Sequence, residues 1–109
     1  MKKITLINIL GTERKIELPD KKSIEITIGR SRDNDIVINE PFLSNFVSRK
    51  HCKIFYDSKV YPYPRVMDLD STNGTSVNDY GLMPQKEYSN LKDGDILKLG
   101  NYDLKIKLK

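Results

Sequence analysis

The last eight residues of the chain alternate strictly between apolar and polar side chains. The apolar ones are Tyr102, Leu104, Ile106 and Leu108, and an aspartate and three lysines fill the other positions. Successive side chains of an extended strand point to opposite faces, so this pattern predicts a strand with one face buried and the other in water. Three isoleucines in residues 24–28 repeat the alternation. Both segments favour a sheet protein.

Similar short segments recur along the chain, with polar turns between them. The further strand candidates are residues 3–10, 14–18, 35–38, 51–57, 65–69, 75–78 and 95–99. The sequence contains no alanine but many β-branched and aromatic residues, a mixture that favours strand over helix. No segment shows a helical period with caps. Strands at spacings of roughly 8–12 residues predict an all-β sandwich or barrel.

The 109 residues match the size of one domain, so we expect a single domain over residues 1–109. No apolar run approaches the roughly 20 residues that span a bilayer, and we expect no contact with a membrane. The charged start resembles a signal peptide, but its apolar stretch is short and polar residues interrupt it. The single cysteine, Cys52, excludes an internal disulfide and fits a reducing compartment, which predicts a cytoplasmic, intracellular protein. We expect its thiol to lie in the core.

The net charge of +4 suggests an acidic partner but does not identify it. Nucleic acid is an unlikely partner, because the lysines are scattered along the chain and no recognition helix or stacking motif is evident. One histidine and one cysteine leave little for acid–base or nucleophilic chemistry. We therefore expect no enzyme activity, no catalytic residue, no cofactor and no metal site.

Three loops carry the polar groups of interest. They are Gly29-Arg30-Ser31, Ser48-Arg49-Lys50-His51 and Ser71-Thr72-Asn73-Gly74-Thr75. Each follows or precedes a predicted strand, and loops at one end of a sandwich can converge. If these three do, they bring two guanidinium groups, several hydroxyls and an amide together, a set suited to a phosphate group and a neighbouring peptide backbone. Taken singly, each is an ordinary surface turn, and Asn73-Gly74 is expected to supply positive φ angles.

The order and spacing of these blocks are more informative than any one of them. In chain order they are Gly29-Arg30, Ser48-Arg49-Lys50-His51, Asp68-Leu69-Asp70-Ser71-Thr72-Asn73-Gly74-Thr75, Val77-Asn78, Leu91-Lys92-Asp93-Gly94-Asp95-Ile96 and Leu99-Gly100. Together they resemble the forkhead-associated (FHA) domain over nearly the whole chain. The resemblance implies a SMAD/FHA-type β-sandwich of about eleven mostly antiparallel strands. It also implies a protein-interaction module that recognises phosphothreonine in partner proteins, in signalling or regulated assembly.

The resemblance assigns roles by position. Arg30 and Ser48 match the phosphate-contacting pair, and Arg49 offers a second cation or a backbone contact. Thr72 and Asn73 match the second recognition loop, where the asparagine holds the peptide main chain.

Three further residues match structural positions. Gly29 is expected to let the Arg30 backbone turn, Gly74 to take the left-handed conformation, and His51 to brace the loops by hydrogen bonds. A phosphate-independent interaction module of the same fold is the alternative function, and a basic nucleic-acid-binding domain is a second, less favoured one.

Two features depart from the family pattern. Residues 40–46 form a longer segment that brings Phe42 and Phe46 into a recognition loop. We expect both rings to form local core, and the alternative is an exposed apolar contact for the ligand's flanking residues. Asp79 stands where a glycine often follows the Val-Asn block, but aspartate also tolerates a tight turn.

Overall fold

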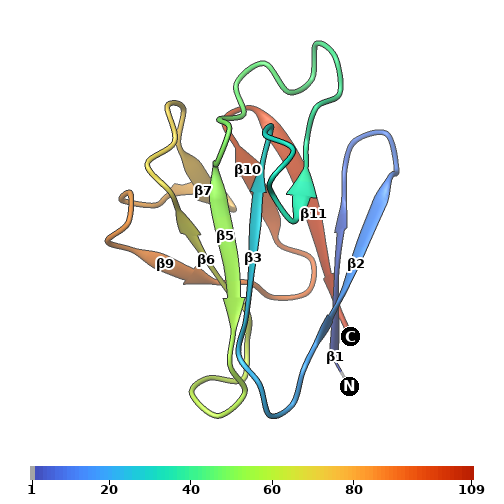
Figure 1. The fold of residues 1–109 in the computed structure, drawn as a ribbon, viewed down its shortest axis with the longest axis vertical. Helices are drawn as coiled ribbons and strands as arrows, with labels where there is room; N and C mark the ends of the chain where they lie inside the picture. The colour runs from blue at the N-terminus through green and yellow to red at the C-terminus, as the bar shows by residue number, and fades with distance from the viewer. Residues whose placement is uncertain (1) are drawn as a thin grey trace.

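A computed structural model describes residues 2–109, which form two packed β-sheets without a helix (Figure 1). The first sheet has the order β2-β1-β11-β10-β7-β8 and contains β1 (Lys2–Ile7), β2 (Glu13–Leu18), β7 (Thr75–Val77), β8 (Tyr80–Gly81), β10 (Ile96–Leu99) and β11 (Tyr102–Leu108). The second has the order β4-β3-β5-β6-β9 and contains β3 (Ile24–Gly29), β4 (Ile36–Val37), β5 (Cys52–Tyr56), β6 (Arg65–Asp68) and β9 (Tyr88–Asn90).

These eleven strands of the described residues confirm the predicted all-β sandwich. Every strand pairing is antiparallel except that of β3 with the short β4. The sequence did not reveal β8 or β9. Asn78 and Asp79, with φ of 50° and 68°, form the tight turn that leads from β7 into β8.

The core lies between the sheets and uses the predicted alternation. On β11, Tyr102, Leu104 and Ile106 are buried and the residues between them are exposed. Cys52 at the start of β5 is fully buried, as expected, and this burial raises the pKa of its thiol. Its sulfur is therefore a core atom, held as the neutral thiol.

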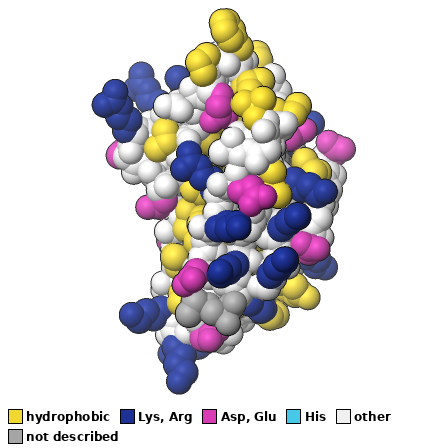
Figure 2. All heavy atoms as spheres, turned by 90° about the vertical axis from the view of Figure 1, so that its right-hand side faces the viewer, with side chains coloured by type: hydrophobic (Ala, Val, Ile, Leu, Met, Phe, Trp, Pro, Cys, Tyr) yellow, Lys and Arg dark blue, Asp and Glu magenta, His cyan; other side chains and the backbone are white. Residues whose placement is uncertain are grey.

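The lysines that are scattered along the sequence gather on the outer face of the six-stranded sheet. Lys3 and Lys15 lie on β1 and β2, and Lys105 and Lys107 lie on β11 between the inward-facing residues. Figure 2 shows Lys and Arg side chains grouped near the centre of this side of the molecule, below a group of hydrophobic side chains. Strand pairing thus creates a basic surface that no tract of the sequence indicates.

Residues 2–109 contain no helix with the length and apolar character needed to cross a membrane.

Candidate functional site

The strand register brings the three polar loops to one end of the sandwich. Ile28 pairs with Cys52, so the end of β3 lies beside the start of β5. Cys52 also pairs with Asp68, so the end of β6 lies on the other side of the same residue. The β3–β4, β4–β5 and β6–β7 loops therefore leave the sheet as neighbours, at the upper end of the molecule in Figure 1.

The β3–β4 and β4–β5 loops are joined through their backbones. The amides of Arg30 and Ser31 donate to the carbonyls of Ser48 and Arg49, at 3.0 and 3.1 Å. A Cβ atom on Gly29 would lie 2.1 Å from the Arg49 carbonyl oxygen, which is far inside contact distance. Gly29 has no positive φ, so this close approach, rather than a turn of the Arg30 backbone, is the reason that glycine is needed here.

Arg30 and Ser48 present donors side by side. Arg30 Nε donates to the Val47 carbonyl, which fixes the guanidinium plane. The Ser48 hydroxyl oxygen accepts from the Thr72 amide at 3.0 Å, so its own hydrogen is left to donate elsewhere. Within residues 2–109, the terminal amino groups of Arg30 make no hydrogen bond or ion pair. A fixed guanidinium with free ends, next to a hydroxyl, suits a multivalent anion.

The β6–β7 loop adds Thr72 and Asn73, both exposed. Asn73 Nδ2 donates to the Phe46 carbonyl at 3.1 Å, which ties this loop to the β4–β5 loop. Arg49 lies on the same loop as Ser48, but its exposed side chain makes no hydrogen bond or ion pair with another described residue. The structure thus brings Arg30, Ser48, Thr72 and Asn73 together, whereas the exposed Arg49 guanidinium is not tied to them by a hydrogen bond.

The His51 side chain connects the β4–β5 and β6–β7 loops from beneath. Its ring is fully buried, with Nδ1 accepting from the Ser48 amide at 3.0 Å and Nε2 lying 2.7 Å from the Gly74 carbonyl oxygen. Since Nδ1 accepts, Nε2 must carry the hydrogen and donate to Gly74. Burial lowers the pKa of His51 below its ordinary value, against the opposing effects of the Gly74 hydrogen bond and the Asp68 charge.

This geometry makes stability depend on pH. A second proton on Nδ1 would face the Ser48 N–H, and the charged ring would be buried. In the unfolded chain the pKa of His51 is near 6.5, and in the folded protein it is lower. The contribution of the neutral ring to stability is therefore fully present above about pH 6.5 and is lost as the pH falls below that value. We expect the Tm, measured by calorimetry, to drop between pH 7.5 and 5.5. The drop should be clearly smaller in His51→Gln, and equal slopes for both proteins would contradict the role of the neutral ring.

A buried carboxylate organises the β6–β7 loop. Asp68, fully buried at the end of β6, accepts from the Ser71 amide at 3.0 Å, the Ser71 hydroxyl at 2.5 Å and the Thr75 hydroxyl at 2.6 Å. The Gly74 amide donates to the Ser71 hydroxyl oxygen at 2.9 Å. Positive φ angles occur at Asp70 (64°) and, as expected, at Gly74 (87°), but not at Asn73. The Asn73-Gly74 pair therefore supplies one such angle, and Asp70 supplies the other.

A model of the protein family described as "FHA domain" matches residues 26–100, a range that contains all three loops. The chain belongs to the FHA domain family.

The relatives and solved structures agree with this. An FHA domain-containing protein of Arabidopsis thaliana, At4g14490, is 35% identical over 100 residues, which cover 91% of this chain and 24% of that protein. The chain thus spans about a quarter of that relative's length. The FHA domain of FhaA from Mycobacterium tuberculosis, solved in complex with the intracellular domain of Rv3910, superposes with a TM-score of 0.72 and 29% identity over 95% of this chain and 99% of that one.

A second solved structure comes from a structural and functional analysis of phosphothreonine-dependent FHA domain interactions. It superposes with a TM-score of 0.73 and 28% identity, and covers 96% of this chain and 95% of the other. FHA domains are binding modules, and the described part of this one contains no group of three His, Cys, Asp or Glu side chains placed to hold a metal ion.

Sequence reasoning missed two buried supports of this FHA site. One is Asp68. It ends an apolar strand three residues before a serine, and this sequence pattern, which favours side-chain hydrogen bonds to a turn, could have indicated its role. The other is Asn34, whose Nδ2 donates to the carbonyls of Ser31 at 2.8 Å and Arg49 at 2.6 Å. Lys50, without a predicted role, forms an ion pair of 3.3 Å with Asp33 across the same two loops.

The phenylalanines of the β4–β5 loop were expected to form local core, and this expectation is wrong. The exposed fractions of Phe42 and Phe46 are 90% and 50%. Leu43 and Ser44 anchor the loop instead: Leu43 packs against the core, and the buried Ser44 hydroxyl donates to the Glu40 carbonyl at 2.8 Å. With these two turned inward, the flanking rings face solvent.

Proposed function

We propose that this FHA domain binds threonine-phosphorylated proteins through the loops at the upper end of the sandwich. The observation that carries the proposal is the fixed Arg30 guanidinium beside the Ser48 hydroxyl, with unused donors on both. A phosphothreonine brings about −1.5 to −2 charges at pH 7 and three acceptor oxygens. Hydrogen bonds to charged groups contribute roughly 1.5–3 kcal/mol each, so a few of them make binding depend on the phosphate.

Each predicted residue has a role in this proposal. Arg30 and Ser48 hold the phosphate, and Arg49 supplies a second cation or a backbone contact. The peptide main chain lies along the β6–β7 loop, next to Thr72 and Asn73, and the Asn73 side chain hydrogen-bonds to that main chain. Gly29, His51 and Gly74 keep the loops in place and do not touch the ligand.

The domain is proposed to act as a single unit of residues 1–109 without catalysis and without a cofactor. Strands β1, β2 and β11 lie wholly outside residues 26–100, yet they form one side of the six-stranded sheet, where β11 pairs with β10, and they contribute to the core. A domain without them would lack half of one sheet. The proteins that this chain resembles in sequence are several times longer, so further domains elsewhere in the same protein are compatible with this role.

We place this domain in the cytoplasm. The FHA domain of FhaA was solved with a partner's intracellular domain. A single free, buried thiol such as that of Cys52 also fits a reducing compartment.

Calorimetric titration of matched peptides tests the proposal. The probe is the best binder from a phosphothreonine peptide library, compared with the same sequence carrying phosphoserine, phosphotyrosine or unmodified threonine. We expect the phosphothreonine peptide to bind and the unmodified peptide to bind at least about a hundredfold more weakly, since about 2.7 kcal/mol of charged hydrogen bonding is lost. Equal affinities would refute phosphate recognition and favour the phosphate-independent alternative.

A further inference from the structure

Four strands of the described residues lie at the edges of the two sheets, and one of them is long. Strands β4, β8 and β9 contain two, two and three residues, whereas β2 contains six. Figure 1 shows β2 along the outer margin of the molecule. Edge strands present unpaired amides and carbonyls, and natural proteins often protect them by keeping them short. Among these four, β2 offers the longest edge to another strand.

The hydrogen bonds of β1 show which backbone groups of β2 face the open edge. Lys3 of β1 exchanges two backbone hydrogen bonds, of 2.8 and 3.0 Å, with Lys109 beyond the end of β11. Because the bonding direction alternates along a strand, the next residue of β1 faces β2, where it pairs with Ile16. The amides and carbonyls of Lys15 and Glu17, on either side of Ile16, therefore point to the open edge. Within the described chain β2 pairs with β1 alone, so these groups are free to bond.

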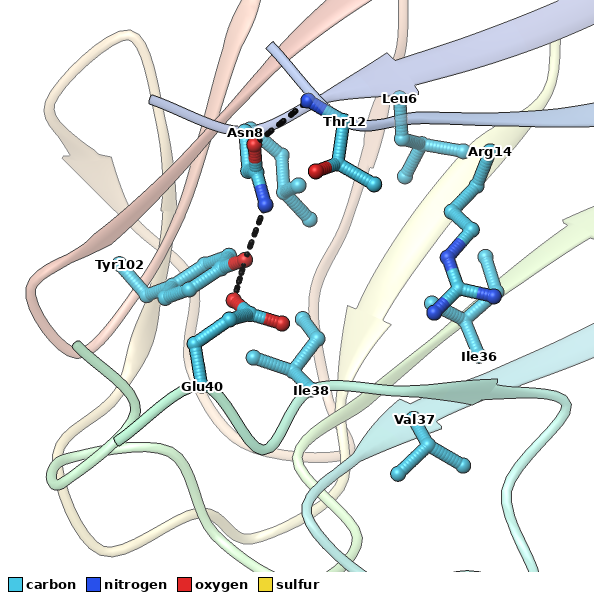
Figure 3. A pocket seen from close by; sticks show the side chains of 10 residues that line it. Leu6, Asn8, Thr12, Arg14, Ile36, Val37, Ile38, Glu40 and Tyr102 are labelled. Atoms are coloured by element: carbon cyan, nitrogen blue, oxygen red, sulfur yellow. Dashed lines mark hydrogen bonds between the residues drawn. The ribbon is translucent and has the colours of Figure 1, made fainter. Parts of the chain in front are cut away.

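The two faces of β2 differ in what they could offer a partner strand. On the inner face, Leu18 is fully buried and Ile16 packs against the core from a half-buried position. Arg14 also belongs to this face: it lines a pocket between the sheets, and Figure 3 shows its side chain directed toward Ile36 of β4. The outer residues of β2 are all charged and exposed. A strand that joins this edge must therefore match the charges of the outer face.

Two antiparallel copies of β2 match these charges in one register. A twofold axis perpendicular to the sheet joins the two edges with like faces on the same side. Placing Lys15 opposite Lys15, or Glu17 opposite Glu17, sets like charges against each other, which is destabilising. Placing Lys15 opposite Glu13 sets Arg14 opposite Arg14. Placing Lys15 opposite Glu17 forms two ion pairs, one on each side of the axis, and sets Ile16 opposite Ile16.

Charged residues on an edge usually prevent strand pairing, but those of β2 have both signs. Glu17 already lies opposite Lys3 of β1, so Lys15 of a second copy would complete a row of alternating charge. The ion pair that Lys15 now makes with Glu13, at 3.6 Å, is exposed and therefore weak. Figure 2 views the molecule from the side of β2 and shows basic and acidic side chains interspersed there. Such an edge repels other registers and accepts this one.

We propose that this chain forms a twofold dimer through β2, in which Lys15 of each copy lies opposite Glu17 of the other and exchanges backbone hydrogen bonds with it. The two six-stranded sheets then become one continuous sheet. The inference does not depend on the proposed function. Strand β2 begins at the end of the molecule that carries the phosphate-binding loops, and its partner runs in the opposite direction (Figure 1). The dimer therefore presents its two sets of loops at opposite ends, where they reach two separate ligands.

Sedimentation equilibrium of charge-reversal variants tests the dimer. We expect wild type to dimerise reversibly with a Kd below about 1 mM. Lys15→Glu sets carboxylates opposite carboxylates, and Glu17→Lys sets ammonium groups opposite ammonium groups, so each variant should dimerise about tenfold more weakly or less. The two changes shift the net charge in opposite directions, so a loss in both cannot result from net charge. An equimolar mixture of the two variants should recover the wild-type affinity, because every pair in the mixed dimer is again of opposite charge.

Lys107→Glu is the matched control. Lys107 is exposed on the same outer face but lies on β11, which β1 separates from β2. The variant should dimerise as wild type does. Thermal unfolding of each variant shows whether it is folded.

A cysteine variant tests the register independently of charge. Residues opposite each other in a non-hydrogen-bonded pair have Cα atoms about 4.5 Å apart, within the range that a disulfide spans. Oxidised Ile16→Cys should therefore form a covalent dimer, and Arg14→Cys should not. The native Cys52 is buried and should not interfere.

Several outcomes would overturn the inference. One is a wild-type chain that stays monomeric at about 1 mM. Another is single charge reversals that dimerise as tightly as wild type, and a third is a mixture of folded variants that does not recover the affinity. A covalent dimer of Arg14→Cys but not of Ile16→Cys would refute the register. Loss of phosphate dependence in peptide binding would overturn the proposed function and leave the dimer intact.

Discussion

Replacing Arg30 with alanine is expected to weaken the binding of a phosphothreonine peptide about thirtyfold or more. Removing one partner of a buried charged hydrogen-bonding pair typically costs about 2–5 kcal/mol, and each 1.4 kcal/mol is a factor of ten. Folding should change little, because the Arg30 side chain is exposed and loses only its Nε bond to the Val47 carbonyl. Calorimetric titration with the phosphothreonine peptide measures the loss, and the thermal transition reports the fold.

Two variants show whether geometry or charge is responsible. Arg32→Ala removes the same charge from the same loop, and Arg32 is exposed and makes no hydrogen bond within residues 2–109. We expect less than a threefold effect. Arg30→Lys keeps the charge but loses the planar fork, so it should fall between wild type and alanine. Equal losses for Arg30→Ala and Arg32→Ala would mean that the net positive charge of the loop, and not the fixed guanidinium, attracts the peptide.

The sequence predicted the strands that have two different faces. The alternation of β11 and of β3 was clear because one side of each strand packs on the core and the other lies in water. The missed strands, β8 and β9, have two and three residues, too few to show a period of two. Their positions depend on the strands with which they pair, β7 and β6, and not on a pattern of their own.

Within the site, too, the sequence predicted some residues and missed others. The residues proposed to face a ligand could be named from the resemblance, since they sit in loops with recognisable composition. The supports could not, because the partners of Asn34 and Asp68 are backbone groups and hydroxyls whose positions the sequence does not encode locally. Phe42 and Phe46 were assigned to the core by composition alone, whereas the inward direction in that loop is taken by Leu43 and Ser44.

Asp68→Asn should have the largest effect on folding. The substitution keeps the side-chain size but replaces one acceptor oxygen with an NH2 group. If the remaining oxygen faces the hydroxyls of Ser71 and Thr75, the new donor faces the Ser71 amide, and two buried N–H groups then lie against each other. We expect the free energy of unfolding to fall by about 3 kcal/mol and the Tm by more than about 10 °C. Chemical denaturation and calorimetry measure these changes.

The same change should impair binding well below the Tm, because Thr72 and Asn73 are placed by the turn that Asp68 holds. Asp70→Asn is the matched control. It removes a neighbouring carboxylate that is exposed and makes no hydrogen bond within the described residues, and asparagine tolerates the φ of 64° found there. Its stability should stay within about 0.5 kcal/mol of wild type. If Asp68→Asn binds the phosphothreonine peptide at 10 °C as tightly as Asp70→Asn does, the carboxylate stabilises the fold without positioning the loop. If both variants are equally stable, the hydrogen bonds of Asp68 contribute nothing specific to stability. Removing the carboxylate that accepts three hydrogen bonds would then cost no more free energy than removing one that is exposed to solvent.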